Sequence, residues 1–288
     1  MKLFKNFHRK APMEIAVHCI VSAIFMVVAL SYLYILVWAF LAGVRTHTEI
    51  VFNPLALPTK WNFRNYIDVF SLLEVNGKNF FDMLLNSVWF SVVTVLLQQV
   101  STMSFAYCCS KYKFPGSKLP YAIILIMITL PIYGSGGATY KLVHSLGLID
   151  SYAYVLMGIS GFNMHFLYYT AYFKNLSWSY AEAAMIDGAN AWQIYLYAMF
   201  PQAKPIFGAL FLTSWVGSWN SYEGALVYLP NLPTMPVGIY QFNIEMIYRA
   251  RFDILFAACV LVSIPALILF TAFNKTITTN VSVGGLKG

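Results

Sequence analysis

The stretch that decides the fold runs from Ile15 to Val44 and reads IAVHCIVSAIFMVVALSYLYILVWAFLAGV. It lies between Glu14 and Arg45 and contains no Asp, Glu, Lys or Arg. A helix needs roughly 20 mainly apolar residues to cross a bilayer, so this run is long enough to span one. Basic residues precede it, as in a secretory signal, but the apolar core of a signal covers only about 7–15 residues. We interpret the run as an uncleaved first span.

The composition of the whole chain agrees with this interpretation. Hydrophobic residues make up 59% of the 288 residues and charged residues only 10%, whereas soluble domains carry roughly 25% charged residues. Lipid must therefore surround most of the surface. Further uncharged runs cover residues 83–110, 119–140, 151–173, 205–222 and 254–274, and we count the fifth as a span because apolar sequence resumes after Glu223. The sequence predicts an all-α membrane protein with six transmembrane helices.

The net charge of +7 is a topology signal rather than a nucleic-acid footprint. If the N-terminus lies in the cytoplasm and the spans alternate, the surplus of lysine and arginine falls inside, as insertion requires. The acids of the cytoplasmic segments are then only Glu14, Glu182 and Asp187. The basic residues outside are matched by acids. Both termini are therefore predicted to be cytoplasmic.

The expected organisation is one membrane domain without a separate soluble domain. Residues 1–14 form the cytoplasmic N-terminus, residues 15–274 the membrane domain and residues 275–288 a cytoplasmic tail. The external segment 43–82 is expected to hold a short amphipathic helix over residues 61–70. The external segment 230–253 contains Pro230, Pro233 and Pro236, which cannot continue a helix, and is expected to be an irregular loop.

Two spans contain internal breaks. Pro131 is followed by the glycine-rich residues 134–137, and Pro265 interrupts the last span. Such kinks are tolerated where neighbouring helices satisfy the freed backbone groups. They are read either as adjustments of shape for packing or as a hinge that lines a pathway.

The cytoplasmic connection between the fourth and fifth spans, about residues 175–204, carries helical signals. Ser179 followed three residues later by Glu182 is a capping-box pattern that predicts a helix from about Tyr180. Alanines favour this helix and Gly188 can end it in a left-handed conformation. A second short helix is expected from about residue 190 to 199, ending before Pro201.

Two interpretations of this loop stay open on chemistry alone. The small side chains of the first helix would let the backbone of another protein approach closely. Alternatively, the tryptophans and tyrosines that follow would suit a linker lying on lipid headgroups.

The sequence resembles a known family at this point. Glu182-Ala183-Ala184, three residues, Gly188 and the distal Pro201 are similar to the EAA loop of binding-protein-dependent ABC importer permeases. Further matches in the same order along the chain are Leu85-Asn86-Ser87, Phe114-Pro115-Gly116, Leu130-Pro131, Leu146-Gly147-Leu148-Ile149, Trp219-Asn220 and Gly284-Gly285-Leu286-Lys287-Gly288. Together they resemble the shorter, six-span subunit of the maltose-type carbohydrate permeases, with the type I importer fold.

The chain departs from the family pattern at three places. Ser177 to Ser179 stand where the family usually has a proline, and Phe200 stands where leucine commonly precedes the distal proline. An acid commonly follows the Trp-Asn pair, whereas here Ser221 follows it and Glu223 comes two residues later.

The resemblance implies a non-catalytic subunit of a sugar importer in the bacterial cytoplasmic membrane. It implies two cytoplasmic ATPase subunits, a second permease that completes a heterodimer, and an extracytoplasmic solute-binding protein that meets the loop 230–242. The ATPase-coupling residues would be Glu182, Ala183, Ala184, Asp187, Gly188 and Pro201, and the tail 281–288 would also touch the ATPases. The chain has no glycine-rich phosphate loop ending in Lys-Ser/Thr, so it has no ATP site of that kind.

Polar residues inside the spans are the candidates for contact with substrate. Asn86, Asn220 and Glu223 are the main candidates, and Gln98, Gln99 and His165 are weaker ones. Polar groups are costly in lipid and tend to face a wet cavity or the protein interior. The competing interpretation of each is an interhelical hydrogen bond, and His165 in particular is expected to be packed and hydrogen-bonded. The cysteines show no metal-ligand spacing, and no metal or cofactor is expected.

Two other classes of membrane protein would carry different sequence features. A stand-alone secondary transporter or channel would carry internal repeats and paired charges in its spans. A membrane enzyme would need clustered carboxylates or histidines, whereas the acids here are scattered. Neither class accounts for the ordered set of motifs.

Overall fold

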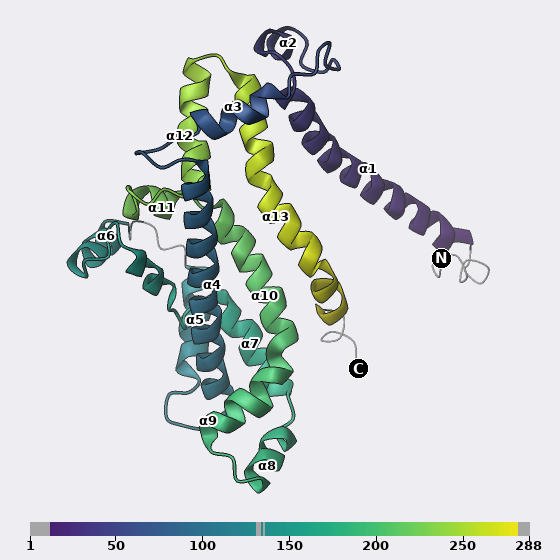
Figure 1. The fold of residues 1–288 in the computed structure, drawn as a ribbon. Coiled ribbons are helices and arrows are strands. Elements are labelled where there is room, and N and C mark those ends of the chain that lie inside the picture. Colours follow the sequence, from purple (N-terminus) through teal and green to yellow (C-terminus); the bar gives the residue numbers. More distant parts are fainter. Residues whose placement is uncertain (1–11, 131–133, 135, 282–288) are drawn as a thin grey trace. The chain divides into compact units, whose positions relative to one another are not determined.

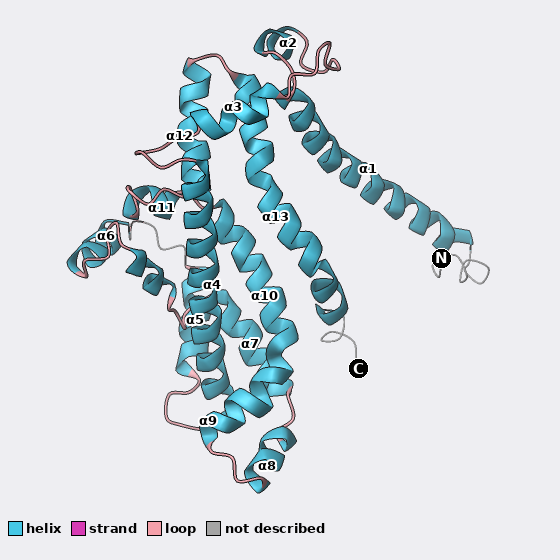
Figure 2. Ribbon diagram, viewed as in Figure 1, coloured by secondary structure: helices cyan, strands magenta, loops and turns pink. Residues whose placement is uncertain are grey.

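The computed structural model describes residues 12–130, 134 and 136–281, and the described part is helical without strands (Figures 1 and 2). The helices, in chain order, are α1 (Pro12–Gly43), α2 (His47–Phe52), α3 (Arg64–Leu72), α4 (Phe80–Lys111), α5 (Leu119–Thr129), α6 (Gly136–Ser145), η2 (Tyr152–Gly158), α7 (Met164–Asn175), α8 (Ser179–Ile186), α9 (Ala191–Gln193), η3 (Ile194–Met199), α10 (Phe200–Asn220), α11 (Glu223–Tyr228), α12 (Met235–Tyr248) and α13 (Phe252–Val281). The predicted all-α fold is confirmed.

Three helices in the described part are long and apolar enough to cross a membrane by length and composition. They cover Met13–Gly43, Phe80–Lys111 and Phe252–Leu269. The other predicted spans are interrupted. The third run falls on α5 and α6, the fourth on η2 and α7, and the fifth on α10 and α11. Pro131 and the C-terminal glycine motif lie outside the described residues.

The break in the fourth run shows how irregular backbone is accommodated between spans. The carbonyl of Ser160 accepts hydrogen bonds from the hydroxyls of Ser101 (3.0 Å) and Thr102 (2.6 Å) on α4. The side chain of Asn163 accepts from the N–H of His165 at 2.9 Å and so caps α7. Because the freed backbone groups find partners inside the protein, the break can lie at membrane depth.

Two proline predictions are wrong. Pro265 lies inside α13, which continues through it to Val281. A membrane helix tolerates an internal proline where its surroundings satisfy the freed carbonyl. The segment expected to be an irregular loop contains α12, with Pro236 in its first turn. The first turn has no intrahelical acceptor for its N–H groups, so a proline costs nothing there.

The contacts divide the chain into two compact units. The first comprises the chain up to Leu72 together with Phe242–Val262. Inside it the guanidinium of Arg45 is buried and donates to the carbonyls of Glu49, Asn53 and Pro54, so that a charge holds the turn after α1. The predicted amphipathic helix appears as α3, whose Tyr66 donates to the carbonyl of Phe40. No residue of the most apolar 18-residue window of α1 is buried, and only the end of the helix, at Ala42 and Gly43, is covered.

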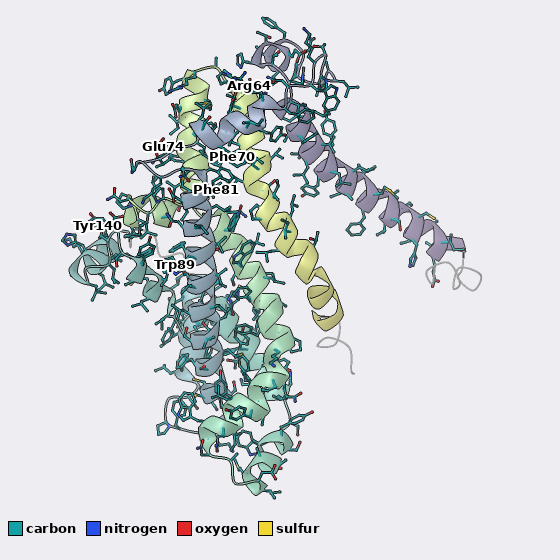
Figure 3. All side chains as sticks on the ribbon, viewed as in Figure 1. Arg64, Phe70, Glu74, Phe81, Trp89 and Tyr140 are labelled. Carbon is teal, nitrogen blue, oxygen red and sulfur yellow. The ribbon has the colours of Figure 1, made fainter. Side chains whose placement is uncertain are left out.

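The second unit comprises Leu73–Gln241 and the chain from Ser263 onward. Helix α4 is its axis and contacts α7, α10 and η2. Trp89 of α4, which is labelled in Figure 3, packs edge-on against Tyr152 of η2, with ring centroids 5.1 Å apart. Near the end of α4 that holds Lys111, side chains from α4, α5, α7, α8, η3 and α10 form one hydrophobic cluster, which we call the basal core. The basal core joins the 175–204 loop to the spans.

Candidate functional site

The helix α8 of the 175–204 loop begins one residue earlier than predicted, and without the predicted capping box. Trp178 already has helical dihedral angles, and its carbonyl accepts from Ala181 N (2.8 Å) and Glu182 N (3.1 Å). Ser179 therefore lies inside the first turn, where its side chain cannot cap. The hydroxyl of Ser177 accepts from Ser179 N at 3.2 Å instead. The side chain of Glu182 is consequently not used for capping.

The end of α8 is confirmed as predicted. Gly188 has a φ of +80°. The N–H of Ala189 donates to the carbonyl of Ala184 at 2.9 Å, and that of Gly188 to the carbonyl of Met185 at 3.0 Å. These two bonds form a Schellman motif, which satisfies the last carbonyls of a helix and needs a left-handed residue. The chain turns sharply away from α8 at this point.

The second short helix differs from the prediction. Asn190 and Gln193 form a true capping box at the start of α9, with bonds of 2.8 and 3.0 Å. The spacing Asn-x-x-Gln was the signal that could have revealed it. The helix does not end before Pro201. It passes through the π-helical turn η3 into α10, of which Pro201 is the second residue.

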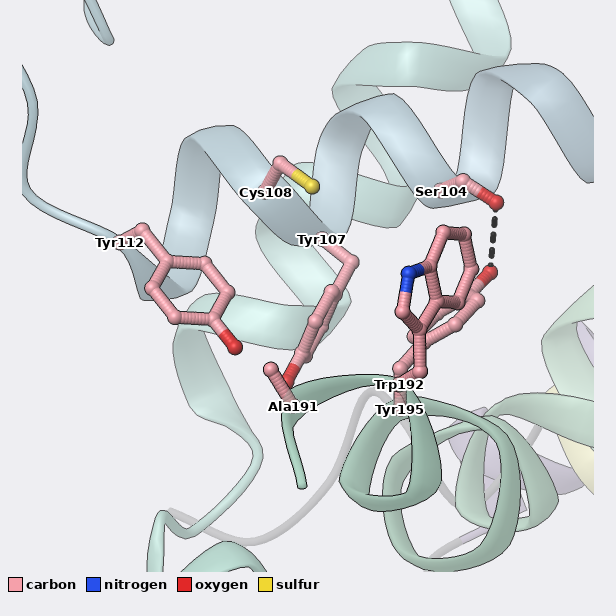
Figure 4. A pocket seen from close by; sticks show the side chains of 7 residues that line it. All are labelled: Ser104, Tyr107, Cys108, Tyr112, Ala191, Trp192 and Tyr195. Carbon is pink, nitrogen blue, oxygen red and sulfur yellow. Dashed lines mark hydrogen bonds between the residues drawn. The ribbon is translucent and has the colours of Figure 1, made fainter.

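The loop is firmly attached to the spans through the basal core. Ala181 of α8 is fully buried, and Ala184 and Ala189 pack against the same cluster. Tyr195 of η3 packs against Tyr107 of α4 with ring centroids 4.8 Å apart. Its hydroxyl lies 2.8 Å from the hydroxyl of Ser104 (Figure 4). Burial raises the pKa of Tyr195.

The opposite face of α8 is open to solvent. Glu182 and Ala183 are exposed, and Ile186 exposes 87% of its surface. Within the described part of the chain, neither Glu182 nor Asp187 forms an ion pair. An open hollow of about 430 Å³ beside the helix end is lined by Ala184, Asp187, Gly188, Ala189, Gln193, Tyr197 and Ala198. The Glu-Ala-Ala triplet thus divides: Ala184 faces the basal core, whereas Glu182 and Ala183 face outward.

The candidate substrate residues do not form one cluster. Asn86 of α4 is half-buried and donates to the carbonyl of Pro233 at 3.1 Å, so its side chain joins α4 to the loop before α12. Asn220 and Glu223 are exposed on either side of the break between α10 and α11. The side chain of Asn220 donates to the carbonyl of Val216 at 2.9 Å, within its own helix.

The polar groups deep in the second unit form a closed network instead. Gln99 of α4 is fully buried. Its amide nitrogen lies 2.9 Å from His165 Nδ1 and donates to Ser214 Oγ at 2.8 Å, and its carbonyl accepts from Tyr169 at 2.8 Å. The network joins α4, α7 and α10. The prediction that His165 is a packed, hydrogen-bonded residue is confirmed. Within the described residues no group of three or more His, Cys, Asp or Glu could hold a metal ion.

The described residues thus hold three helices long and apolar enough to cross a membrane, and a loop helix, α8, attached to α4, α7 and α10 through the basal core. Residues 110–283 match the family described as the binding-protein-dependent transport system inner membrane component. The chain belongs to this family. It is a multi-pass permease of the cell membrane, and the family implies ATP-binding subunits and a solute-binding protein as partners.

Similar proteins extend the match to most of the chain. The diacetylchitobiose uptake permease NgcG of Streptomyces coelicolor is 28% identical over 88% of this chain and 83% of its own. The arabinooligosaccharide permease AraQ of Bacillus subtilis is 26% identical over 97% of this chain and 99% of its own. A crystal structure of a bacterial ABC transporter that imports the acidic polysaccharide alginate contains a chain with 22% identity and a TM-score of 0.74, over 92% of this chain and 98% of that one. The last likeness shows the fold.

Proposed function

We propose that α8 is the element through which ATP-driven movement of the ATPase subunits reaches the spans. One observation carries this proposal: α8 is anchored on one face, through Ala181, and open on the other, at Glu182 and Ile186. A helix that only linked two spans across lipid headgroups would not need a rigid base. A helix that transmits force needs both a free surface for the partner and a stiff connection to what it moves.

Each loop residue has a proposed part in this docking. The exposed carboxylates of Glu182 and Asp187 would pair with basic side chains of an ATPase subunit, and Ala183 would allow close approach. Ala184 would hold the helix to the basal core. Gly188 would fix the bend, and Pro201 would keep the start of α10 helical.

The test is coupling in the reconstituted transporter. Glu182→Lys reverses a charge at the proposed interface and is expected to lower both substrate-stimulated ATP hydrolysis and uptake at least about tenfold, since an opposed charge pair at an interface costs several kcal/mol. Glu74→Lys makes the same change on an exposed residue just before α4, at its other end (Figure 3), and should leave both unchanged. Full coupling in Glu182→Lys would refute the docking proposal.

The proposed cargo is a sugar, and an oligosaccharide in particular. The support is that relatives matching most of this chain are named for diacetylchitobiose, arabinooligosaccharides and galactooligosaccharides. Among the candidate residues, Asn220 and Glu223 are the better substrate contacts because they are exposed at a helix break, whereas Asn86 is engaged with Pro233. Uptake of labelled oligosaccharides by cells with Glu223→Gln, compared with Glu74→Gln, tests this assignment. An unchanged KM and rate in Glu223→Gln would remove that residue from the pathway.

The remaining partners and the orientation complete the proposal. The outward-facing apolar surface of α1 would meet lipid and a second, different permease subunit, and residues 1–14 and 275–288 would be cytoplasmic. The solute-binding protein would meet residues 230–242 on the outside. Asn231 is the suitable crosslinking position, because Thr234 is buried. A cysteine at 231 that formed no crosslink to the binding protein during transport would contradict this contact.

A further inference from the structure

A second hollow lies close to the 175–204 loop but is separate from α8. It has a volume of about 330 Å³ and lies among the end of α4, the turn after it, the start of α5 and the end of α7. Its lining includes Lys113, Lys118, Lys174, Tyr121, Ser117 and Thr170. Small-molecule pockets in proteins have volumes of about 300–1,000 Å³, so the hollow can hold a ligand group.

The hollow is strongly basic. Its lining contains three lysines and no carboxylate. Lys174 is placed over the ring of Tyr121, with Nζ 5.1 Å from the ring centroid. None of the three lysines forms an ion pair within the described residues. The neighbouring Lys111 is different, since it donates to the carbonyl of Leu176 at 2.6 Å and lies outside the lining. Three lysines therefore line one space without a counter-charge in its lining.

A buried hydroxyl in the lining also has no partner. Thr170 of α7 is 3% exposed, and its Oγ1 atom, which is inaccessible, has no hydrogen-bond partner among the described residues. Buried polar side chains are nearly always hydrogen-bonded, so an orphan hydroxyl in a basic hollow indicates a missing acceptor. The start of α5, which borders the hollow, adds the positive end of its helix dipole, and its N-cap Lys118 makes no side-chain cap.

We propose that this hollow binds the phosphate headgroup of an anionic phospholipid. The phosphate oxygens would accept from the ammonium groups of Lys113, Lys118 and Lys174, and from the hydroxyl of Thr170 once that side chain turns toward the hollow. The exposed apolar side chains of α5, among them Leu125 and Ile128, continue from the hollow along the span and give the acyl chains a surface to follow. Basic pockets between spans on the cytoplasmic side are suited to anionic headgroups. The assignment to that leaflet rests on the proposed orientation.

The experiment measures lipid binding to the intact transporter by native mass spectrometry, without nucleotide, sugar or binding protein. Dioleoylphosphatidylglycerol and dioleoylphosphatidylcholine are titrated separately. The variant Lys113→Gln/Lys118→Gln/Lys174→Gln should bind phosphatidylglycerol at least about tenfold more weakly than the native transporter, since each lysine near an anionic headgroup adds to affinity. Binding of phosphatidylcholine should not change. Thr170→Val should weaken phosphatidylglycerol binding alone, by a smaller factor.

Two control variants make the result interpretable. Lys60→Gln/Lys78→Gln/Lys141→Gln changes the net charge equally, but none of these lysines lines the hollow, and it should bind lipid normally. The arginine triple variant at positions 113, 118 and 174 keeps the charge and should retain binding. Equal losses in the two glutamine variants, or no preference for phosphatidylglycerol, would overturn the proposal. Displacement of the lipid by millimolar inorganic phosphate would assign the site to a free anion instead.

The outcome is independent of the proposed coupling. Lipid binding is measured without ATP turnover, so failure of α8 to dock an ATPase would leave it unaffected. The orientation is checked separately by labelling Lys118→Cys in inside-out vesicles. Labelling from the outside of intact cells would contradict the orientation without changing the measured affinity.

Discussion

The bend at Gly188 allows a quantitative test of how α8 is held. Gly188 has a φ of +80°, and a Cβ added there would meet nothing within 4 Å. The cost of Gly188→Ala is therefore backbone strain alone, roughly 1–2 kcal/mol for an L-residue in the left-handed region. That energy shifts the equilibrium between the formed and frayed ends of α8 by a factor of about 5–30. We expect uptake and substrate-stimulated ATP hydrolysis in proteoliposomes to fall several-fold.

Gly147 provides a matched control elsewhere in the second unit. It has a φ of +66°, open space around its Cβ position and the same pair of bonds, Leu148 N to Val143 O and Gly147 N to His144 O, both 3.0 Å. Gly147→Ala should carry a similar strain and lower thermal stability similarly, but leave coupling intact. Gly188→Asn should be milder than Gly188→Ala, because Asn tolerates this conformation. Equal coupling in the two alanine variants would refute the reasoning that the end of α8 matters for function.

Three further variants test the contacts that support the loop and the spans. Gln99→Leu removes the hub shared by His165, Ser214 and Tyr169 and should lower resistance to unfolding in mixed micelles by about 1–2 kcal/mol, at roughly 0.6 kcal/mol per interhelical bond. Gln98→Leu is the control, and an equal loss of resistance to unfolding in the two variants would contradict the stabilising role of the Gln99 network. Arg45→Met leaves the carbonyls of Glu49, Asn53 and Pro54 without their donor. Because hydrogen bonds to charged groups are worth about 1.5–3 kcal/mol, the turn after α1 should lose about 3 kcal/mol of stability. Faster proteolysis after α1 would show this loss. Arg64→Met removes only an exposed ion pair of 3.7 Å and should cost at most about 1 kcal/mol. Tyr195→Phe loses the bond to Ser104 and should lower stability by about 1 kcal/mol. No loss of stability in Tyr195→Phe would show that this bond does not hold the loop.

Helix content and membrane insertion followed from the sequence because they depend on local composition. An uncharged run such as 15–44 has only one low-energy environment, a helix in lipid, whatever the rest of the chain does. The end of α8 was equally local, since glycine at position 188 costs little in the conformation that a Schellman motif requires. The family was recognisable from spacing within the loop and confirmed by the match over residues 110–283.

The errors arose where a local pattern had two solutions. Ser177 and Ser179 are both residue types that can cap a helix. Because Trp178 has helical dihedral angles, the hydroxyl of Ser177 rather than that of Ser179 accepts a backbone N–H at the start of α8. Pro201, Pro236 and Pro265 were read as helix breakers, yet all three lie in helices. A proline costs little in the first turn of a helix and is tolerated inside a membrane helix whose neighbours satisfy the freed backbone groups. The proline alone does not tell which of these positions it occupies.

The sequence by itself determined that this chain is inserted in the membrane, that it is helical, and that the 175–204 loop contains a helix that ends at a glycine. Only the tertiary structure decided which face of that helix is free. Ala181 and Ala183 are chemically identical, but Ala181 is buried in the basal core, which also holds residues of α4 and α7, and Ala183 is exposed. The same holds for Thr170 and the three lysines near it, which are brought together around one hollow by α4, α5 and α7. Contacts between distant segments depend on how whole helices pack, and that packing is a property of the assembled chain rather than of any window of its sequence.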